Sequence, residues 1–297
     1  MQRPLDRTAV IGSGTLGAQI AMLAANAGYQ VKAFDVREGA LDQTLNTVKG
    51  IEMLVPRSNW PTCRKRIQVT TDLTEAVADA ELVIEVVPEI LDLKRKVWSE
   101  IGSKAHPNAI MATNSSSIPV SRLEKYGNRP DKSLNIHFYI GMPMADVMAG
   151  TKTSDEVFEI GTRWVRSLKL IPLTVKKEIL GFCFNRVWRA VKREVLRMWA
   201  EGYVDFRDVD RAWMLFNGMK HDSSAFGPFA LMDKVGLDVI YDIEMVYFNE
   251  SQDPKDFPPA VLKEKIEKGE LGVKSGKGFY SYPDPDYLNP DFLNPLA

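Results

Sequence analysis

The sequence predicts an α/β protein in which a doubly wound parallel sheet precedes a mostly α-helical C-terminal domain. The first observation is that short apolar runs alternate with segments of helical periodicity through the first part of the 297-residue chain. The second is that strand signals nearly vanish after Lys176, where glycines separate longer helical segments. We therefore expect two domains, residues 1–179 and residues 180–297.

Each expected element follows from its local pattern. Strands are expected where short apolar runs lie between turn residues, and helices where apolar residues recur at three- and four-residue spacing. The expected strands are 8–11, 29–34, 67–70, 82–87, 109–112, 134–138 and 171–175. The expected helices are 16–27, 38–54, 91–104 and 154–168, followed in the second domain by 182–201, 206–216, 237–248 and 259–268. The tail after Tyr280 contains four prolines and is expected to form an irregular surface strap.

A glycine-rich turn joins the first expected strand to the first expected helix. Gly12 permits a tight turn, Gly14 lets the backbone approach a pyrophosphate, and Gly17 lets the helix pack closely on the strand. Thr15 and Leu16 open the helix, whose free N–H groups and positive dipole end favour phosphates. This order predicts a dinucleotide site, and an ordinary glycine turn in a parallel sheet is the alternative.

An acidic residue at the end of the second strand specifies the dinucleotide. Asp35 follows Gly17 by 18 residues, where a carboxylate can accept a hydrogen bond from a ribose 2′-hydroxyl and would repel a 2′-phosphate. The cofactor is therefore expected to be NAD. Arg37 is the counter-argument, because a nearby guanidinium can hold the 2′-phosphate of NADP.

Composition excludes several classes of protein. The net charge of −1 provides no general attraction for nucleic acid or for an anionic membrane, and no apolar stretch approaches the length of a membrane span. Residues 1–6 lead almost at once into the first strand, so no targeting peptide is expected. Cys63 and Cys183 have no metal-ligand spacing and form no disulfide framework, which favours a cytoplasmic protein without a metal site.

One of three histidines occupies the position of a candidate general base. His137 lies at the C-terminal end of an expected strand, and ligands of open α/β sheets bind beyond those ends. His106 precedes a proline in an expected loop, and His221 lies in a polar stretch. A structural role for His137 is the alternative.

Seven stretches in one order carry a resemblance to a known family. They are 12–17, 85–89 with Lys94, 113–119, 136–138, 181–186, 227–233 and 272–280. In these stretches the chain resembles the L-3-hydroxyacyl-CoA dehydrogenases over nearly its full length. The resemblance implies a Rossmann-type domain followed by a helical domain that usually forms a homodimer.

The resemblance also implies roles for individual residues. His137 matches the catalytic histidine, Ser116 a serine near the substrate oxygen, and Asn185 an asparagine that helps to hold substrate and nicotinamide. The positions that match residues along the cofactor are Val87, Glu89, Lys94 and Asn114. From the sequence alone, Ser116 also suits a turn, Asn185 a buried helix position, and Glu89 and Lys94 a solvated helix face.

The segment after His137 departs from the family pattern. The family has His-Phe-Phe-Asn-Pro and, further on, a glutamate, whereas this chain has Ile140-Gly141 in place of Asn-Pro. Matching the segment from Gly150 backwards puts Asp146 at the position of the glutamate, with a shorter loop. Matching it without a gap puts Ala149 there and leaves no carboxylate. We prefer Asp146, because a carboxylate orients a catalytic imidazole and stabilises its cation.

Two basic groups bear on the substrate. Arg189 and Lys192 share a helix face with Asn185, so they are candidates to bind an anionic substrate group, or else lie on a solvated face or at a dimer contact. A second set, Lys49, Arg57 and residues 64–66, falls in the segment through which the family binds part of CoA.

The sequence therefore predicts an NAD-dependent oxidoreductase of secondary alcohols, nominally converting L-3-hydroxyacyl-CoA to 3-oxoacyl-CoA in fatty acid metabolism. His137 is the expected base, oriented by Asp146. One alternative is a dehydrogenase of a free anionic hydroxy acid, similar to gulonate and carnitine dehydrogenases. Others are a lysine-dependent dehydrogenase of the 6-phosphogluconate type and a non-catalytic NAD-binding protein.

Overall fold

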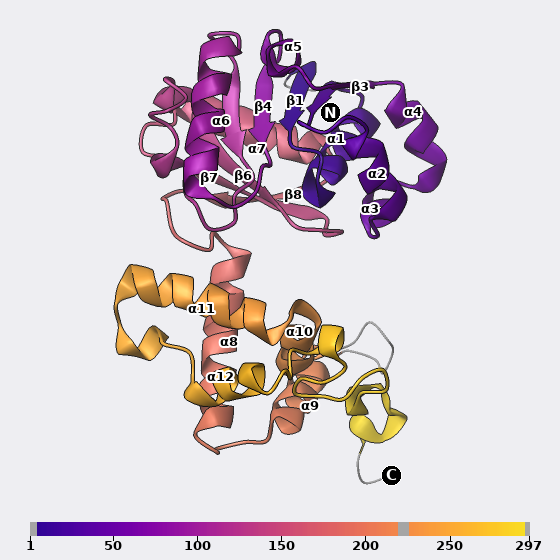
Figure 1. The fold of residues 1–297 in the computed structure, drawn as a ribbon, viewed down its shortest axis with the longest axis vertical. Helices are drawn as coiled ribbons and strands as arrows, with labels where there is room; N and C mark the ends of the chain where they lie inside the picture. Colours follow the sequence, from indigo (N-terminus) through magenta and orange to yellow (C-terminus); the bar gives the residue numbers. More distant parts are fainter. Residues whose placement is uncertain (1–4, 219–225, 295–297) are drawn as a thin grey trace. The chain divides into compact units, whose positions relative to one another are not determined.

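The computed structural model describes residues 5–218 and 226–294, and the chain divides into two compact units, residues 1–184 and 185–297 (Figure 1). The first unit is built on a sheet, and the second is helical. His221 and residues 1–4 lie outside the described residues.

An eight-stranded sheet, counted over the described residues, organises the first unit. Its spatial order is β3-β2-β1-β4-β5-β6-β7-β8. Neighbouring strands are parallel except β6 and β7, which are antiparallel, so the predicted doubly wound sheet is confirmed for most of its width. The strands are β1 (Arg7–Ile11), β2 (Gln30–Phe34), β3 (Ile67–Thr70), β4 (Leu82–Glu85), β5 (Ile110–Thr113), β6 (Ser133–Phe138), β7 (Met144–Ala149) and β8 (Ile171–Val175).

β7 was not predicted, and its direction depends on a short turn. Residues 139–143 connect β6 to β7, and Gly141 adopts a φ of 67° in that turn. The buried side chain of Gln19 holds the turn through both ends of its amide: Nε2 donates to the Tyr139 carbonyl at 2.9 Å, and Oε1 accepts the Gly141 N–H at 2.9 Å. A connection this short can only reverse the chain, because parallel neighbours need a long crossover.

Helices cover both faces of the sheet. Along β1, Val10 faces one apolar core and its neighbours Ala9 and Ile11 face the other, as the alternation of a strand requires. Residues of α1 and α7 contribute to the core with Val10, and residues of α5 and α6 to the other. The helices of this unit are α1 (Thr15–Asn26), α2 (Ala40–Thr47), α3 (Ile51–Leu54), α4 (Trp60–Arg64), α5 (Leu73–Val77), α6 (Leu91–Lys104) and α7 (Asp155–Ser167).

Further details of this unit differ from the prediction, including α4, which was not expected. The single helix expected over 38–54 is divided into α2 and α3, because Gly50 has a φ of 101° that a continuous right-handed helix does not allow. The short helix α5 was not predicted; its N-terminus is capped by the Asp72 side chain, which accepts the Thr74 N–H.

Buried carboxylates join the helices of the second unit. The helices are α8 (Phe184–Ala200), α9 (Phe206–Phe216), α10 (Pro228–Val235), α11 (Leu237–Ser251) and α12 (Ala260–Glu267). Asp210 on α9 accepts the N–H groups of Phe229 and Ala230 at the start of α10, a helix that was not predicted. Asp233 on α10 in turn accepts the N–H groups of residues 279 and 280.

The tail is irregular, apart from short 3₁₀ turns, but it is more than a surface strap. Tyr287 and Phe292 are buried in the apolar core of the helical unit. Within residues 5–218 and 226–294, no helix is long and apolar enough to cross a membrane.

The basic face predicted on α8 is buried among carboxylates rather than open to a ligand. Arg189 contacts Glu244 at 3.3 Å and Asp256 at 2.7 Å, and Lys192 contacts Glu244 at 2.8 Å. Both cations are less than one-tenth exposed. Because their charges are already balanced inside the helical unit, this arrangement does not support their expected contact with a substrate anion.

The ion cluster predicts how this unit responds to acid. Burial opposes ionisation of Asp256, but hydrogen bonds from Ser251, Arg189 and Arg193 prevail and hold its pKa at about 2, below the usual 3.8. A carboxylate with a lowered folded pKa stabilises the fold above its unfolded pKa, and loses that contribution as the pH falls toward 2. We expect Asp256→Asn to lower the free energy of unfolding by up to about 2 kcal/mol at pH 7.

Urea denaturation at pH 7, 5 and 3 measures this effect, and the difference from the wild type should narrow at pH 3. Asp242→Asn, at an exposed position of α11, is the matched control and should have little effect at any of these pH values. Equal acid sensitivity of the two variants would contradict a stabilising role of the cluster.

Candidate functional site

The glycine turn between β1 and α1 is shaped by two close backbone contacts. Gly12 has a φ of 111°, and a Cβ at this residue would lie 2.7 Å from the Val86 carbonyl oxygen. A Cβ at Gly17 would lie 1.9 Å from the Gly12 carbonyl oxygen, so Gly17 packs against the turn itself more closely than against the strand. A Cβ at Gly14 would meet nothing within 4 Å, which leaves open space at the N-terminus of α1. The turn therefore fits the pyrophosphate of a dinucleotide.

Asp35, directly after β2, binds the backbone of the glycine turn. One carboxylate oxygen accepts the Ser13 N–H at 2.9 Å, and the other accepts the Arg37 N–H at 3.0 Å. The Arg37 guanidinium lies 3.4 Å from the same carboxylate and is otherwise largely exposed. Both oxygens retain lone pairs for a ribose hydroxyl, and the pairing of Arg37 with Asp35 favours NAD over NADP.

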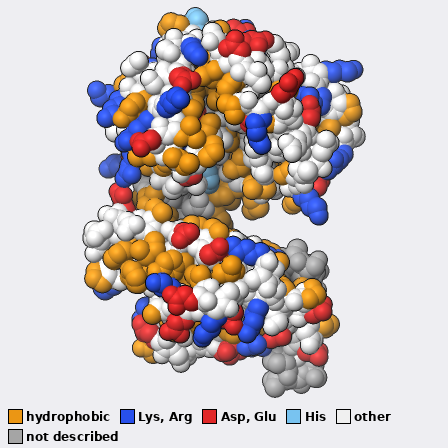
Figure 2. All heavy atoms as spheres, in the orientation of Figure 1, with side chains coloured by type: hydrophobic (Ala, Val, Ile, Leu, Met, Phe, Trp, Pro, Cys, Tyr) orange, Lys and Arg blue, Asp and Glu red, His pale blue; other side chains and the backbone are white. Residues whose placement is uncertain are grey.

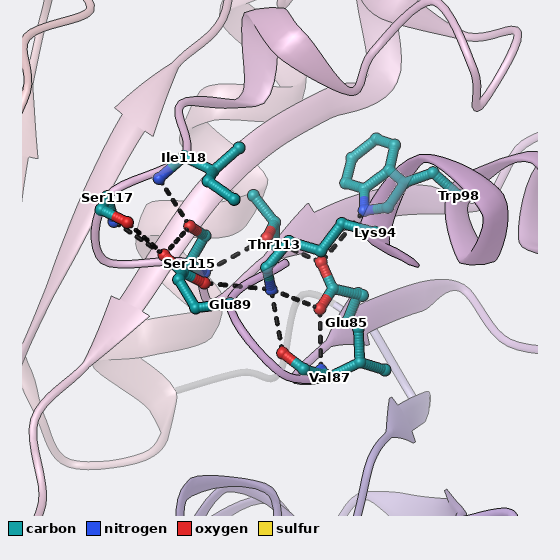
Figure 3. Close-up of polar contacts among 9 residues, drawn as sticks. All are labelled: Glu85, Val87, Glu89, Lys94, Trp98, Thr113, Ser115, Ser117 and Ile118. Atoms are coloured by element: carbon teal, nitrogen blue, oxygen red, sulfur yellow. Dashed lines mark hydrogen bonds and ion pairs between the residues drawn. The ribbon is translucent and has the colours of Figure 1, made fainter. Parts of the chain in front are cut away.

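A buried carboxylate at the end of β4 organises the other side of the site (Figure 3). Glu85 Oε1 accepts from Lys94 Nζ at 2.7 Å and from the Val87 N–H at 2.8 Å. Its Oε2 accepts from the Trp98 indole and the Thr113 hydroxyl. Glu85 and Lys94 are both almost completely buried, so each charge needs the other. The predicted cofactor residue Lys94 is thus tied to a residue whose role was not predicted.

Glu89 extends this network toward the loop that follows β5. Its Oε1 accepts from the Ser117 N–H at 2.9 Å and from the hydroxyl groups of Ser115 and Ser117. Burial opposes its ionisation, but the Lys94 ammonium and these hydrogen bonds lower the pKa of Glu89 below its ordinary value. Glu89 is therefore an ionised anchor for the serine loop at neutral pH.

Most of the predicted cofactor residues, together with Ser116 and His137, line one pocket of the first unit. They are Gly14, Thr15, Leu16, Val87, Glu89, Lys94, Asn114, Ser116 and His137, joined by Val86, Ser115 and Ile140. Ser116 is exposed, whereas Asn114 is buried and its Oδ1 accepts the Phe138 N–H at 2.9 Å. Asn185 belongs to the helical unit and is not among the lining residues.

The imidazole of His137 contacts a buried carboxylate on the neighbouring strand. His137 and Asp146 are register partners across β6 and β7, and Nδ1 lies 3.4 Å from Oδ2 of Asp146. Phe182 stacks on the imidazole with ring centroids 5.3 Å apart. The alternative partner Ala149 pairs instead with Leu134 at the far end of the strand. The geometry thus favours the alignment that places the family carboxylate at Asp146.

Two polar contacts to Asp146 were not predicted. The Tyr139 hydroxyl donates to Oδ2 at 2.5 Å, and the Cys183 N–H donates to Oδ1 at 3.2 Å. Tyr139 follows His137 by two residues, so the alternation of side chains in an extended segment is the signal that indicates a shared face. Cys183 gives no such local signal, because it reaches Asp146 from 37 residues away in the sequence.

This combination of fold and pocket defines an NAD-dependent oxidoreductase. Residues 7–179 match the NAD-binding domain of 3-hydroxyacyl-CoA dehydrogenases, and residues 181–282 match the C-terminal domain of the same enzymes. The chain belongs to the 3-hydroxyacyl-CoA dehydrogenase family.

Three relatives illustrate the range of this family. The 5-formyl-3-hydroxy-2-methylpyridine 4-carboxylate 5-dehydrogenase of Mesorhizobium japonicum is 32% identical over 287 residues, covering 92% of this chain and 90% of the relative. A solved diketoreductase is 34% identical with a TM-score of 0.79, covering 95% of this chain and all of the other. The structure of (S)-3-hydroxybutyryl-CoA dehydrogenase from Ralstonia eutropha is 28% identical with a TM-score of 0.85, covering 94% and 100% of the two chains.

The open space at Gly14 and the close contact at Gly17 predict different outcomes for the same substitution. Gly14 has a φ of −67°, which alanine adopts freely, so Gly14→Ala should leave stability nearly unchanged. Its methyl group would occupy the space that a pyrophosphate needs, so we expect the Kd for NADH to rise at least about tenfold. Gly17→Ala should destabilise the protein itself, because the new methyl group collides with a backbone oxygen.

Thermal unfolding without cofactor and NADH titration by fluorescence separate the two effects. Equal loss of thermal stability in the two variants, or unchanged NADH affinity in Gly14→Ala, would contradict these roles.

Proposed function

We propose that the protein oxidises a secondary alcohol with NAD, with His137 as the general base and Asp146 as the residue that orients it. The observation that carries this proposal is that His137 lines the same pocket as the glycine turn. Gly14, Val87 and Lys94 line that pocket, and Asp35 accepts the N–H of Ser13 in the glycine turn. When bound there, NAD accepts the hydride that leaves the alcohol carbon.

The chain's own residues accept the proton and position the substrate. As hydride leaves carbon, His137 accepts the hydroxyl proton, and the carboxylate of Asp146 stabilises the resulting imidazolium. The electron pair of the broken O–H bond forms the carbonyl. Ser116 lies at the rim of the same pocket and is proposed to hold the substrate oxygen.

The lysine-dependent alternative receives no support from the pocket. Lys94 lines it, but its Nζ is engaged by Glu85 at 2.7 Å, by Glu89 at 3.3 Å and by the Val87 carbonyl at 3.0 Å. A buried ammonium with three acceptors is poorly suited to exchange a proton with substrate. We therefore assign Lys94 to the architecture of the cofactor loop.

The nominal substrate is an L-3-hydroxyacyl-CoA, which would place the enzyme in fatty acid metabolism, and one part of the expected CoA contact needs revision. Lys65 and Arg66 line a different hollow with Arg7, Gln30 and Ile67, the first residues of β1, β2 and β3. That edge of the sheet is opposite the glycine turn. Lys49 is exposed and precedes Gly50, which adjoins Ile140 of the pocket, so Lys49 is the better candidate for a CoA phosphate.

A second candidate is a free hydroxy acid or dicarbonyl compound. Two relatives are named for substrates of that kind, a pyridine carboxylate and dicarbonyl compounds. Ile140 stands where the family pattern has an asparagine, and Ile140 and Met142 are both exposed apolar side chains. Because Ile140 lines the pocket, an apolar side chain at this position suits a compact substrate with an apolar portion. Arg189 and Lys192 do not contribute to this candidate, because they are neutralised by Glu244 and Asp256.

We further propose that the protein is a homodimer that associates through its helical unit. Val239, Ile243 and Val246 are exposed at four- and three-residue spacing along α11. Figure 2 shows hydrophobic side chains gathered over this helix. An exposed apolar stripe along one helix is typical of a contact surface, and this supports the proposed dimer.

Replacement of His137 tests the proposed base. His137→Asn should lower kcat by about 10²- to 10⁴-fold, because proton transfer to a positioned base is lost. The Kd for NADH should stay within about threefold, well under the tenfold change that 1.4 kcal/mol would produce. His106→Asn is the matched control, because His106 lies in a turn where its Nδ1 accepts the Asn108 N–H. Retention of more than a tenth of the activity by His137→Asn would rule out the proposed role.

A substrate comparison separates the two candidates. Reduction of acetoacetyl-CoA should exceed reduction of acetoacetate and simple diketones by at least about tenfold in kcat/KM if CoA is recognised. Lys49→Glu should then raise the KM for acetoacetyl-CoA alone, whereas Lys65→Glu at the opposite edge of the sheet should not. A preference for the free compounds, with no effect of Lys49→Glu, would replace the nominal substrate by the second candidate.

A further inference from the structure

Three protein groups satisfy the carboxylate of Asp146. The Tyr139 hydroxyl donates to Oδ2 at 2.5 Å, and Nδ1 of His137 lies 3.4 Å from the same oxygen. The Cys183 N–H donates to Oδ1 at 3.2 Å. Asp146 is completely buried, so these groups stand in the place that water takes around an exposed carboxylate.

The two contacts to Oδ2 are unequal. A separation of 3.4 Å is at the long end of hydrogen bonding, whereas 2.5 Å is typical of a strong bond from a hydroxyl to a carboxylate. Asp146 is one methylene shorter than the glutamate it aligns with in the family, which limits its reach toward the imidazole. The rings of Tyr139 and His137 pack edge to face, with centroids 4.5 Å apart and an interplanar angle of 71°. Tyrosine therefore engages the carboxylate more tightly than histidine does.

We infer that Tyr139 is a positioning residue that controls the basicity of His137 through their shared carboxylate. Its hydroxyl fixes the rotation of Asp146 and withdraws negative charge from the oxygen that faces the imidazole. An imidazolium is stabilised less by a carboxylate whose charge is already shared with a phenol. Removal of this hydroxyl is therefore expected to let Asp146 stabilise the imidazolium more strongly.

Other ionisable groups near the imidazole do not offer the same control. Glu89 and Lys94 line the pocket with it, but their polar contacts are with each other, with Glu85 and with the serine loop rather than with Asp146. Cys183 presents its backbone N–H to Asp146, and its side chain is exposed. The neighbouring strand β8 consists of uncharged residues. In the described part of the first unit, the Tyr139 hydroxyl donates to the same carboxylate oxygen that faces the imidazole.

The inference concerns the resting protein, and only its catalytic consequence rests on the proposed function. NMR of cofactor-free protein with ¹³C-labelled histidine measures the pH at which His137 titrates, and His137→Asn identifies its signal. Tyr139→Phe keeps the ring and removes the hydroxyl, so the titration midpoint should rise by about half a pH unit. In an Asp146→Asn background the same substitution should produce no further change, because the shared carboxylate is gone.

Tyr29→Phe is the matched control. The Tyr29 hydroxyl forms a 2.7 Å hydrogen bond with the Ser167 hydroxyl in the same unit, and Tyr29 does not line the pocket. This variant also loses a hydroxyl hydrogen bond, but it should leave the titration of His137 unchanged. A midpoint that does not move in Tyr139→Phe, or that moves equally in Tyr29→Phe, would overturn the inference.

The pH profile of kcat/KM for alcohol oxidation provides the second measurement. Its acid limb should move upward with the NMR midpoint in Tyr139→Phe, while the Kd for NADH stays constant. If the NMR midpoint rises and the acid limb does not, the coupling through Asp146 is supported and the role of His137 as the catalytic base is rejected. The two proposals therefore fail in different ways.

Discussion

The antiparallel pairing of β6 with β7 is the constraint on which the candidate site depends. Parallel strands carry His137 to the edge of the sheet where a dinucleotide binds, but no parallel neighbour supplies a carboxylate at that level. The reversal at residues 139–143 brings Asp146 back along the histidine strand in register with it. A shift of one residue would turn the carboxylate to the opposite face of the sheet. The bidentate hold of Gln19 on the turn opposes such a shift.

A second buried carboxylate, Glu85, positions residues on the cofactor side of the pocket, as Asp146 positions the histidine. Glu85 collects donors from the loop after β4, from α6 and from β5, and so fixes three elements relative to one another. Burying an ion pair contributes little net stability, because desolvation offsets most of the attraction. Its contribution is geometric, since a misplaced α6 would leave two charges without partners. Thus Glu89 and the serine loop have a defined position before any ligand binds.

The sequence predicted best what local pattern determines. The glycine turn, the parallel strands and most helices follow from residue type and spacing, and so does His137 at a strand end. β7 escaped prediction because Met144–Ala149 is buried along most of its length and contains an aspartate, so it shows neither alternation nor a purely apolar run. The spacing of Arg189 and Lys192 correctly gave a shared face, but their partner Glu244 lies on another helix. Long-range pairings of this kind leave no trace in local spacing.

Because long-range pairings leave no trace in local spacing, the sequence did not show which shared motifs belong to the active site and which stabilise the fold. Stretches 227–233 and 272–280 belong to the family pattern, yet what joins them is an architectural contact in the helical unit. Asp233 of the first stretch accepts the N–H groups of residues 279 and 280 of the second. Glycines there are required because a Cβ at Gly278 would lie 2.1 Å from a carboxylate oxygen of Asp233. The carboxylates of Asp35, Glu85 and Asp233 likewise accept backbone N–H groups at the ends of elements.

Asp146 also accepts a backbone N–H, but it differs from those carboxylates in the second partner it faces. That partner is an imidazole, the type of side chain whose ordinary pKa lies nearest to neutral pH. A carboxylate that only joins elements needs donors of constant charge, such as backbone N–H groups. Glu85 and Asp233 also face titratable side chains, a lysine and a tyrosine, but the ordinary pKa values of those groups lie far above neutral pH. The imidazole partner therefore distinguishes Asp146 from these carboxylates, and neither burial nor membership of a shared motif makes that distinction.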